Sequence, residues 1–217
     1  MKKFLFLFVM SLFCVMSLSA WEHSAGLELS APFFSVNAKD DGTKNVIEPQ
    51  GKLRYFGRAS NGFCLSAELG AGGAFSKNFS LENEDATAKG FGMTLAFGAG
   101  YAFDIGERWT LAALGSLSLD WLRFKYKKEI SASLSSGKAT AEWTQTDNAL
   151  FAGIGLELFA MFRLTNNISL AASFAARFID GGSLWKSGTN IGNDYDETYD
   201  LRGNFSLVPS FGATWTF

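Results

Sequence analysis

The sequence predicts an all-β fold in which eight antiparallel strands close into an up-and-down transmembrane β-barrel. Three observations support this fold class. The 217-residue chain is rich in aromatic residues and glycine, and only 18% of it is charged. Apolar and small polar residues alternate with a period of two over most of its length. The connections between these runs are short and long in turn, as in closed antiparallel barrels that cross a membrane.

Length and composition suit a single domain that hides much apolar surface. The chain contains 22 Phe and 23 Gly but only 3 Pro. Its 19 basic and 21 acidic residues leave a formal charge of -2. No strong positive field therefore indicates a nucleic-acid partner. The apolar surface must be covered by a protein core or by lipid.

The N-terminus has the features of an export signal. Two lysines follow the initiating Met, and residues 4–17 form a nearly unbroken apolar run. Small residues then offer cleavage after Ser19 or Ala20. A retained membrane anchor is the alternative, but the run is short for a spanning helix. We therefore expect a signal peptide at 1–20 and a mature barrel domain at 21–217.

Alternation is clearest in the last run. One of its faces carries Phe205, Leu207, Pro209, Phe211, Ala213, Trp215 and Phe217, and the other is small and polar apart from Val208. A run at 50–59 is weaker, because only Leu53 and Tyr55 form its apolar face. The eight predicted strands lie at about 26–33, 50–59, 63–75, 91–103, 109–121, 150–163, 168–178 and 204–217.

A soluble β-sandwich or a lipocalin would also alternate, but its outer face would meet water and carry charged side chains. Here the polar face is mostly Gly, Ala and Ser, which suit the cramped interior of an eight-stranded barrel. In the seven clear runs every charge falls on that face. A basic residue on the apolar face would cost about 2–4 kcal/mol at the bilayer midplane. A helical fold is disfavoured because the glycines would break helices.

The connections predict the orientation of the barrel. Short ones are expected at 60–62, 104–107 and 165–167, and long ones at about 37–48, 77–89, 126–148 and 181–202. In bacterial barrels the short turns face the periplasm and the long loops face outward. An even number of strands then places both termini on the periplasmic side.

The C-terminal residues Phe211, Ala213, Trp215 and Phe217 resemble the closing-strand signal that the outer-membrane insertion machinery reads. The whole mature chain resembles the small eight-stranded bacterial outer-membrane proteins, a group that includes OmpX-like and OmpW-like proteins and the OmpA membrane domain. The resemblance implies the outer membrane of a double-membraned bacterium and assembly by that machinery. It also implies roles from passive stability and adhesion to the uptake of small hydrophobic molecules.

Alternation places nine charges on the face that points into the barrel, and these are the main candidate site. They are Glu28, Lys52, Arg54, Arg58, Glu68, Asp120, Glu157, Arg163 and Arg177. A buried charge without a partner is costly, so their near balance indicates mutual pairing. We expect an ion-paired plug, because eight strands leave little room. A gated narrow pore is the alternative.

Other candidates for chemistry are few. His23 is the single histidine, so a site built on several histidines is excluded, and Cys64 is the one cysteine left after signal cleavage. We read His23 as an interfacial residue and Cys64 as a small filler of the lumen. The last long connection carries Asp194, Asp196, Glu197 and Asp200, which we read as a solvated loop rather than a cation site. No enzyme activity, cofactor or metal is therefore expected.

A basic group lies where the fifth strand leaves the membrane. Arg123, Lys125, Lys127 and Lys128 are candidates for contact with phosphate groups of the outer leaflet, although exposed charges at strand ends are common. Trp109 and Trp121 bound the same strand, as interfacial aromatic residues do.

These observations predict a non-enzymatic, monomeric outer-membrane barrel with a structural or surface-interaction role. Its expected partners are outer-membrane lipid, the assembly machinery and a surface or host ligand that contacts the long loops. The alternative is a narrow channel for small hydrophobic molecules or ions. Pro209 bears on that alternative, because a proline removes one ladder donor and can mark an opening in the wall.

Overall fold

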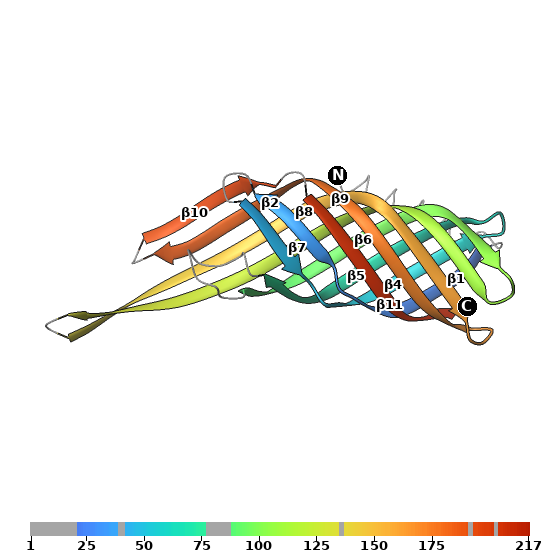
Figure 1. Ribbon diagram of the computed structural model, residues 1–217, viewed down its shortest axis with the longest axis horizontal. Coiled ribbons are helices and arrows are strands. Elements are labelled where there is room, and N and C mark those ends of the chain that lie inside the picture. The colour runs from blue at the N-terminus through green and yellow to red at the C-terminus, as the bar shows by residue number, and fades with distance from the viewer. Residues whose placement is uncertain (1–20, 39–41, 77–87, 135–136, 191–192, 202–203) are drawn as a thin grey trace, which may run out of the picture.

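The computed structural model describes residues 21–38, 42–76, 88–134, 137–190, 193–201 and 204–217. The predicted signal peptide at 1–20 lies outside these residues. Figure 1 shows one antiparallel sheet that curls into an elongated barrel. Among the described residues no helix is long and apolar enough to span a membrane.

Eleven strands make up the sheet over the described residues, and every pairing between them is antiparallel. They are β1 (Trp21–Ser30), β2 (Phe33–Ala38), β3 (Gly42–Ile47), β4 (Gln50–Ala59), β5 (Phe63–Ser76), β6 (Ala88–Ile105), β7 (Trp109–Leu134), β8 (Gly137–Arg163), β9 (Ile168–Asn190), β10 (Asn193–Asp200) and β11 (Asn204–Thr216). The first strand pairs with the last from Ser24↔Thr216 to Ser30↔Ser210, and this seam closes the barrel.

The eleven strands occupy eight positions around the barrel wall. β1 and β2 both pair with β11, and β3 and β4 both pair with β5. β10 and β11 likewise both pair with β9. These three shared positions reduce eleven strands to eight, so the predicted eight-stranded antiparallel barrel is confirmed.

The three predicted short connections are tight turns in the structure, at 60–62, 106–108 and 164–167. Gly62 and Gly106 have φ values of 88° and 65° there, in the left-handed region that glycine enters at little cost. These turns define the short-turn end of the barrel, where β1 begins and β11 ends.

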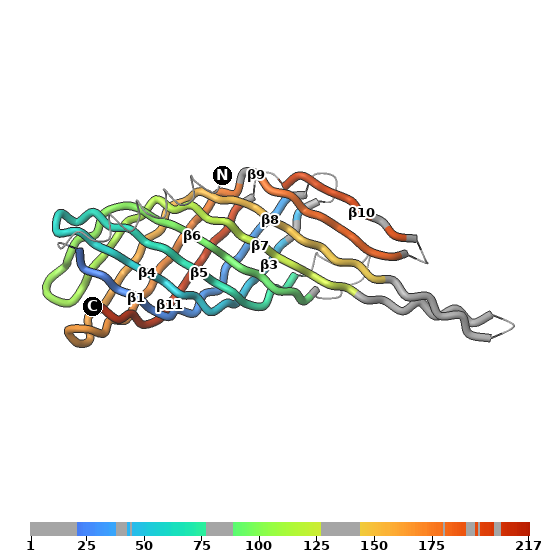
Figure 2. The backbone as a smooth tube through the Cα atoms, turned by 180° about the vertical axis from the view of Figure 1, so that it is seen from behind, coloured from blue at the N-terminus to red at the C-terminus, as the bar shows by residue number. Residues whose placement is uncertain are grey.

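Three of the four predicted long loops are instead β-hairpins, so that prediction was wrong in its detail. β2 and β3 pair from Phe33↔Ile47 to Ala38↔Gly42, and β7 and β8 pair as far as Leu134↔Gly137. β9 and β10 form the third hairpin. Backbone pairing continues where apolar alternation stops, because ladder hydrogen bonds need no apolar face. Figure 2 shows these hairpins extending from one end, the hairpin end. Most of the fourth loop, 77–87, lies outside the described residues.

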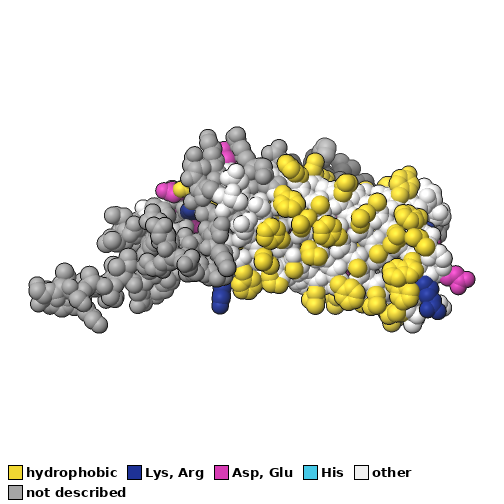
Figure 3. Space-filling model, in the orientation of Figure 1, with side chains coloured by type: hydrophobic (Ala, Val, Ile, Leu, Met, Phe, Trp, Pro, Cys, Tyr) yellow, Lys and Arg dark blue, Asp and Glu magenta, His cyan; other side chains and the backbone are white. Residues whose placement is uncertain are grey.

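The outer wall is apolar and the inner wall is packed closely. Large apolar side chains such as Leu27, Leu156 and Phe211 are exposed. Figure 3 shows hydrophobic side chains spread over the barrel wall on the face in view. On the inner side small residues let strands and side chains approach one another. A Cβ added at Gly100, for example, would clash with the backbone oxygen of Ala113. The alternation of the sequence therefore separates a lipid-compatible exterior from a narrow lumen.

Candidate functional site

The lumen is filled by three layers of side chains. A buried apolar cluster near the short turns contains Phe56, Cys64, Ala102, Ala112, Leu114, Phe159, Met161 and Ala171, and we call it the lower cluster. A second one, the upper cluster, lies toward the hairpin end and contains Phe34, Val36, Val46, Ala74, Leu122, Phe124, Ala149, Phe151, Ile179, Leu184 and Leu201. Along β8 the charged Glu157 lies between Phe151 and Phe159, so charged side chains separate the two clusters.

Arg54 on β4 is the centre of the charged layer. Its Nε lies 2.8 Å from Glu28 Oε1 on β1, and its Nη2 lies 2.5 Å from Glu157 Oε1 on β8. The same Nη2 is also paired with Glu68 on β5. The side chain of Arg54 is fully buried, so one guanidinium holds together carboxylates from three other strands.

Two further cations complete the layer. Lys52 Nζ lies 2.9 Å from Glu28 Oε2 and 3.3 Å from Glu68 Oε1. Arg177 on β9 reaches Glu68 from across the lumen, with its Nη2 3.4 Å from Oε2. Lys52 also donates to Ser210 Oγ at 3.2 Å. These contacts pair the buried charges, while Arg54 Nη1 and Arg177 Nε and Nη1 have no hydrogen-bond partner among the described residues.

Asp120 lies beside this network with a different set of partners. Its carboxylate accepts hydrogen bonds from Thr94 Oγ1 at 2.7 Å and from Ser118 Oγ at 3.0 Å. Its side chain is fully enclosed. The hydroxyl donors come from β6 and β7, so Asp120 is held by the wall on its own side of the barrel.

Aromatic rings close the layer on both sides. The guanidinium carbon of Arg54 lies 4.5 Å from the centroid of the Phe159 ring, and Phe159 packs against Phe56 at 5.0 Å between ring centroids. On the upper side Phe34 and Phe151 meet edge to face at 5.3 Å. The charged layer therefore lies between two groups of packed aromatic rings.

Two of the nine predicted lumen charges lie elsewhere. Arg58 pairs with Asp104 at 2.7 Å, and Arg163 lies 3.6 Å from Glu22. Both pairs are at the short-turn end, beyond the lower cluster, where the barrel opens to water. Alternation assigned the correct side of each strand but not the depth. The other seven, Glu28, Lys52, Arg54, Glu68, Asp120, Glu157 and Arg177, are buried in the lumen.

Sequence reasoning missed other lumen residues. Glu48 fell in a predicted outer loop, yet its side chain is fully buried. Phe151 and Phe159 face inward, but the sequence analysis did not single them out, because apolar residues that face outward stand on either side of each in the sequence. Their signal was a large aromatic residue on a face that otherwise carries glycine and small residues.

The residues of the predicted closing-strand signal lie on the outer wall. Phe211, Ala213, Trp215 and Phe217 are all exposed on β11 or directly after it. The amide of Phe217 donates to the backbone oxygen of His23 at 2.9 Å, and the two rings stack with centroids 6.1 Å apart. His23 is thus a rim residue of the closing seam, and its Nδ1 is 2.6 Å from Tyr55 Oη.

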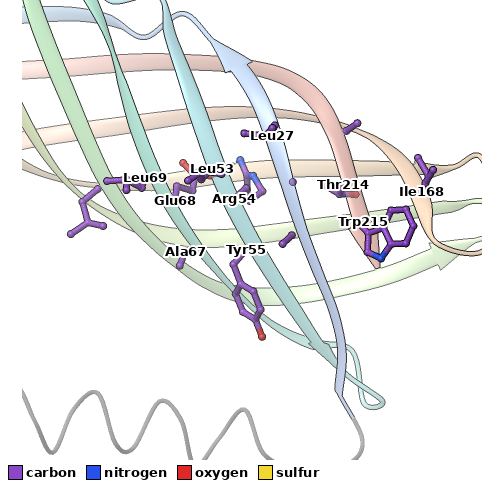
Figure 4. A pocket seen from close by; sticks show the side chains of 14 residues that line it. Leu27, Leu53, Arg54, Tyr55, Ala67, Glu68, Leu69, Ile168, Thr214 and Trp215 are labelled. Carbon is purple, nitrogen blue, oxygen red and sulfur yellow. Dashed lines mark ion pairs between the residues drawn. The ribbon is translucent and has the colours of Figure 1, made fainter. Parts of the chain in front are cut away.

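A groove on the outer wall lies next to this seam. Figure 4 shows Leu27, Leu53, Ile168 and Trp215 around it. The charged side chains of the neighbouring Arg54 and Glu68 are buried in the lumen. Because the groove lies on the outer wall and is lined mainly by apolar side chains, we assign it to the lipid-facing surface.

The remaining candidates lie at the hairpin end or carry no chemistry. Arg123 and Lys125 are exposed there, whereas the side chains of Lys127 and Lys128 lie outside the described residues. The acidic residues Asp194, Asp196, Glu197 and Asp200 are exposed along β10. Cys64 is buried and free. Over the described part of the chain, no group of three or more His, Cys, Asp or Glu residues is placed to hold a metal.

Replacing Arg54 by Ala tests the charged layer. We expect Arg54→Ala to lower the free energy of unfolding by about 3–5 kcal/mol, because three buried carboxylates lose a shared cation. The control is Arg58→Ala on the same strand, whose rim pair with Asp104 should be worth about 1 kcal/mol or less. Denaturant titration of the refolded barrels in detergent micelles measures both. Equal losses in the two variants would contradict a buried ion-paired layer.

Comparisons with known proteins agree with this architecture. A major outer membrane protein from Thermus thermophilus is 15% identical, over 89% of this chain and 99% of that one, with a TM-score of 0.60. OprG from Pseudomonas aeruginosa is 10% identical over 91% and 95%, with a TM-score of 0.54. Neisserial surface protein A is 13% identical over 90% and 97%, with a TM-score of 0.51. No curated protein sequence matches the chain.

At such low sequence identities, the likeness to these solved structures shows a shared fold and nothing finer. Family membership comes from the sequence itself. The model of the family described as "Outer membrane protein beta-barrel domain" matches residues 5–208, which is most of the chain. This chain therefore belongs to the outer-membrane β-barrel domain family, and it is an integral protein of the outer membrane of Gram-negative bacteria.

Proposed function

We propose that this protein is a non-enzymatic outer-membrane barrel whose lumen is closed and whose work is structural or done at the cell surface. The observation that carries the proposal is the ion-paired layer between two buried apolar clusters. An ion that crossed the lumen would have to part Arg54 from its carboxylates and displace packed phenylalanine rings. An open pore needs a continuous aqueous path, and this packing works against one.

The hairpin end offers the surface through which such a barrel would act. β7, β8, β9 and β10 continue there as a sheet, with β9 and β10 paired from Asn193↔Asn190 to Asp200↔Ser183. Over the described residues the other edge of β10 pairs with no strand. An unpaired edge can accept an extended segment of another protein. Asp194, Asp196 and Glu197 are exposed along β10, so a basic segment would complement it.

Conductance in planar bilayers tests the closed lumen. The purified barrel should give no steady conductance of porin size, because the charged layer and the two clusters fill the lumen. A porin incorporated into the same bilayers is the positive control for the recording. Long-lived openings of porin size by the wild-type barrel would refute the closed lumen and favour the channel.

A specific feature of the wall supports a second candidate function, lateral passage of small hydrophobic molecules. All three prolines of the chain, Pro32, Pro49 and Pro209, meet at one level on neighbouring strands, and we call them the proline belt. Ala31 donates to the backbone oxygen of Pro209 at 3.2 Å, and Glu48 donates to that of Pro32 at 2.9 Å. Neither bond has its reciprocal, because proline has no N–H.

Pro49 weakens the next ladder in the same way. It lies between the pairs Ile47↔Phe75 and Gln50↔Gly72 and has no N–H to give to β5. Three successive strand pairs thus each lack a donor beside the upper cluster. A hydrophobic molecule that reached this cluster from outside would leave through the belt without crossing the charged layer.

A reversible disulfide across the belt tests lateral passage. Ala31→Cys with Pro209→Cys, in a Cys64→Ser background, should reduce uptake of a small hydrophobic dye by cells when oxidised and restore it when reduced. The matched control is Leu29→Cys with Phe211→Cys, an outward-facing pair below the belt on the same two strands. Uptake that is unchanged by oxidation of the belt pair would eliminate this second function.

A further inference from the structure

Glu48 is a buried carboxylate of the lumen that takes part in none of the ion pairs of the charged layer. Glu48 follows β3, its side chain is fully buried, and neither of its carboxylate oxygens has a hydrogen-bond partner among the described residues. An ionised carboxylate without a partner is costly to enclose. A group other than these residues must therefore offset its charge.

Gln50, two residues further along the chain, is also buried without hydrogen-bond partners for its side chain. It is 4% exposed, and within the described part of the chain both its amide oxygen and its amide nitrogen lack partners. Both side chains lie over glycines. A Cβ on Gly92 would clash with the carboxylate of Glu48, and a Cβ on Gly70 would clash with Gln50 Oε1. The glycines thus leave room for these two polar groups on the inner wall, Gln50 over β5 and Glu48 over β6.

Asp120 and its hydroxyl donor Thr94 lie on the strands next to these glycines. Gly70 pairs with Thr94, and Thr94 pairs with Asp120, so the three lie in one row across β5, β6 and β7. The Asp120 carboxylate is near enough to repel that of Glu48. Two enclosed carboxylates, an amide oxygen and a hydroxyl therefore line neighbouring strands of the inner wall, and no cation from the described strands is paired with Glu48.

The charge count of the layer indicates what is missing. Among the described residues, six acidic side chains are buried. One of them, Asp147, lies further toward the hairpin end and accepts a hydrogen bond from Gln145 Nε2 at 2.6 Å. The other five are Glu28, Glu48, Glu68, Asp120 and Glu157. Three buried basic side chains accompany these five: Lys52, Arg54 and Arg177. Five minus three leaves an excess of two negative charges. Lys52 and Arg54 are paired with other carboxylates, and Arg177 is paired with Glu68. The positive charge of Arg177 also acts on Asp120, so the carboxylate left with no cation of the described residues is that of Glu48.

We propose that Glu48, Gln50, Thr94 and Asp120 form a binding site for one divalent cation of the calcium or magnesium class. Carboxylate, amide and hydroxyl oxygens are the ligands that these hard cations take, and magnesium is commonly held by only one or two carboxylates with water completing its shell. The site includes no imidazole or thiolate that would favour a softer metal. A charge of two offsets the excess of the layer. The site does not depend on whether the lumen conducts or what the hairpins bind.

Thermal unfolding of the full mature barrel in lipid-free detergent micelles tests the site. After treatment with a chelator, CaCl₂ or MgCl₂ should raise the unfolding midpoint of the wild type saturably, because a ligand that binds only the folded state stabilises it. Glu48→Gln should abolish that rise and should be at least as stable as the wild type in the chelator. Glu197→Gln, which alters an exposed carboxylate on β10, should keep the rise.

Metal analysis of the wild type gives a second readout that needs no variant. After dialysis against CaCl₂, one ion per barrel should remain bound, and a barrel without bound ion would overturn the proposal. An equal rise of the midpoint in Glu48→Gln would also overturn it. The proposal would also be overturned if neither cation raised the unfolding midpoint of the wild type and low pH raised it in the wild type but not in Glu48→Gln. A proton on Glu48 would then be the neutralising group.

Discussion

The enclosure of Arg54 is the interaction on which the rest of this structure depends. Closing eight strands into a barrel leaves a lumen too narrow for bulk water, so any charge inside must find its partner inside. Arg54 meets Glu28, Glu68 and Glu157 from three separate strands. Since Glu157 lies on the far side of the barrel, the network ties opposite walls together as well as neighbouring strands.

This constraint divides the chemistry of the chain between two faces. The outer face meets lipid, so it carries large apolar side chains and excludes charge. The inner face alternates between glycine, which permits close approach, and the few large or charged groups that fill the centre. The phenylalanine rings packed on both sides of the charged layer keep water from competing for its ion pairs. The same packing that stabilises the barrel therefore also obstructs it, and this is why a structural or surface role fits better than an axial channel.

Two features depart from this division between an apolar outer face and a packed inner face, and both bear on function. The proline belt interrupts three neighbouring ladders on one side of the wall, and Glu48 lies directly behind it with no partner from the described strands. At the hairpin end, β10 presents a sheet edge that pairs with no other strand among the described residues. The hairpins lie away from the ion-paired layer, whereas the belt adjoins it, because Ser210 next to Pro209 is bonded to both Lys52 and Glu28.

Alternation in the sequence predicted the strands, the closure and which side of the wall each lumen charge faces. It did not predict depth, which is why Arg58 and Arg163 were placed in the lumen although they pair at the rim. Partners across the lumen, such as Arg54 and Glu157, depend on the stagger of the strands, which a single sequence does not reveal. Glu48 was missed because it lies beside Pro49, where the alternating pattern stops. The hairpins were read as loops because strands in water need no apolar face.

A double-mutant cycle between Arg54 and Glu157 tests the central claim most directly. The free energies of unfolding of the wild type, Arg54→Met, Glu157→Gln and the double variant isolate the coupling of two residues that meet only across the closed lumen. A coupling of about 1–3 kcal/mol is expected for a buried pair in contact. A coupling near zero would show that opposite walls are not tied together through Arg54, and the account of a closed, ion-paired lumen would be contradicted.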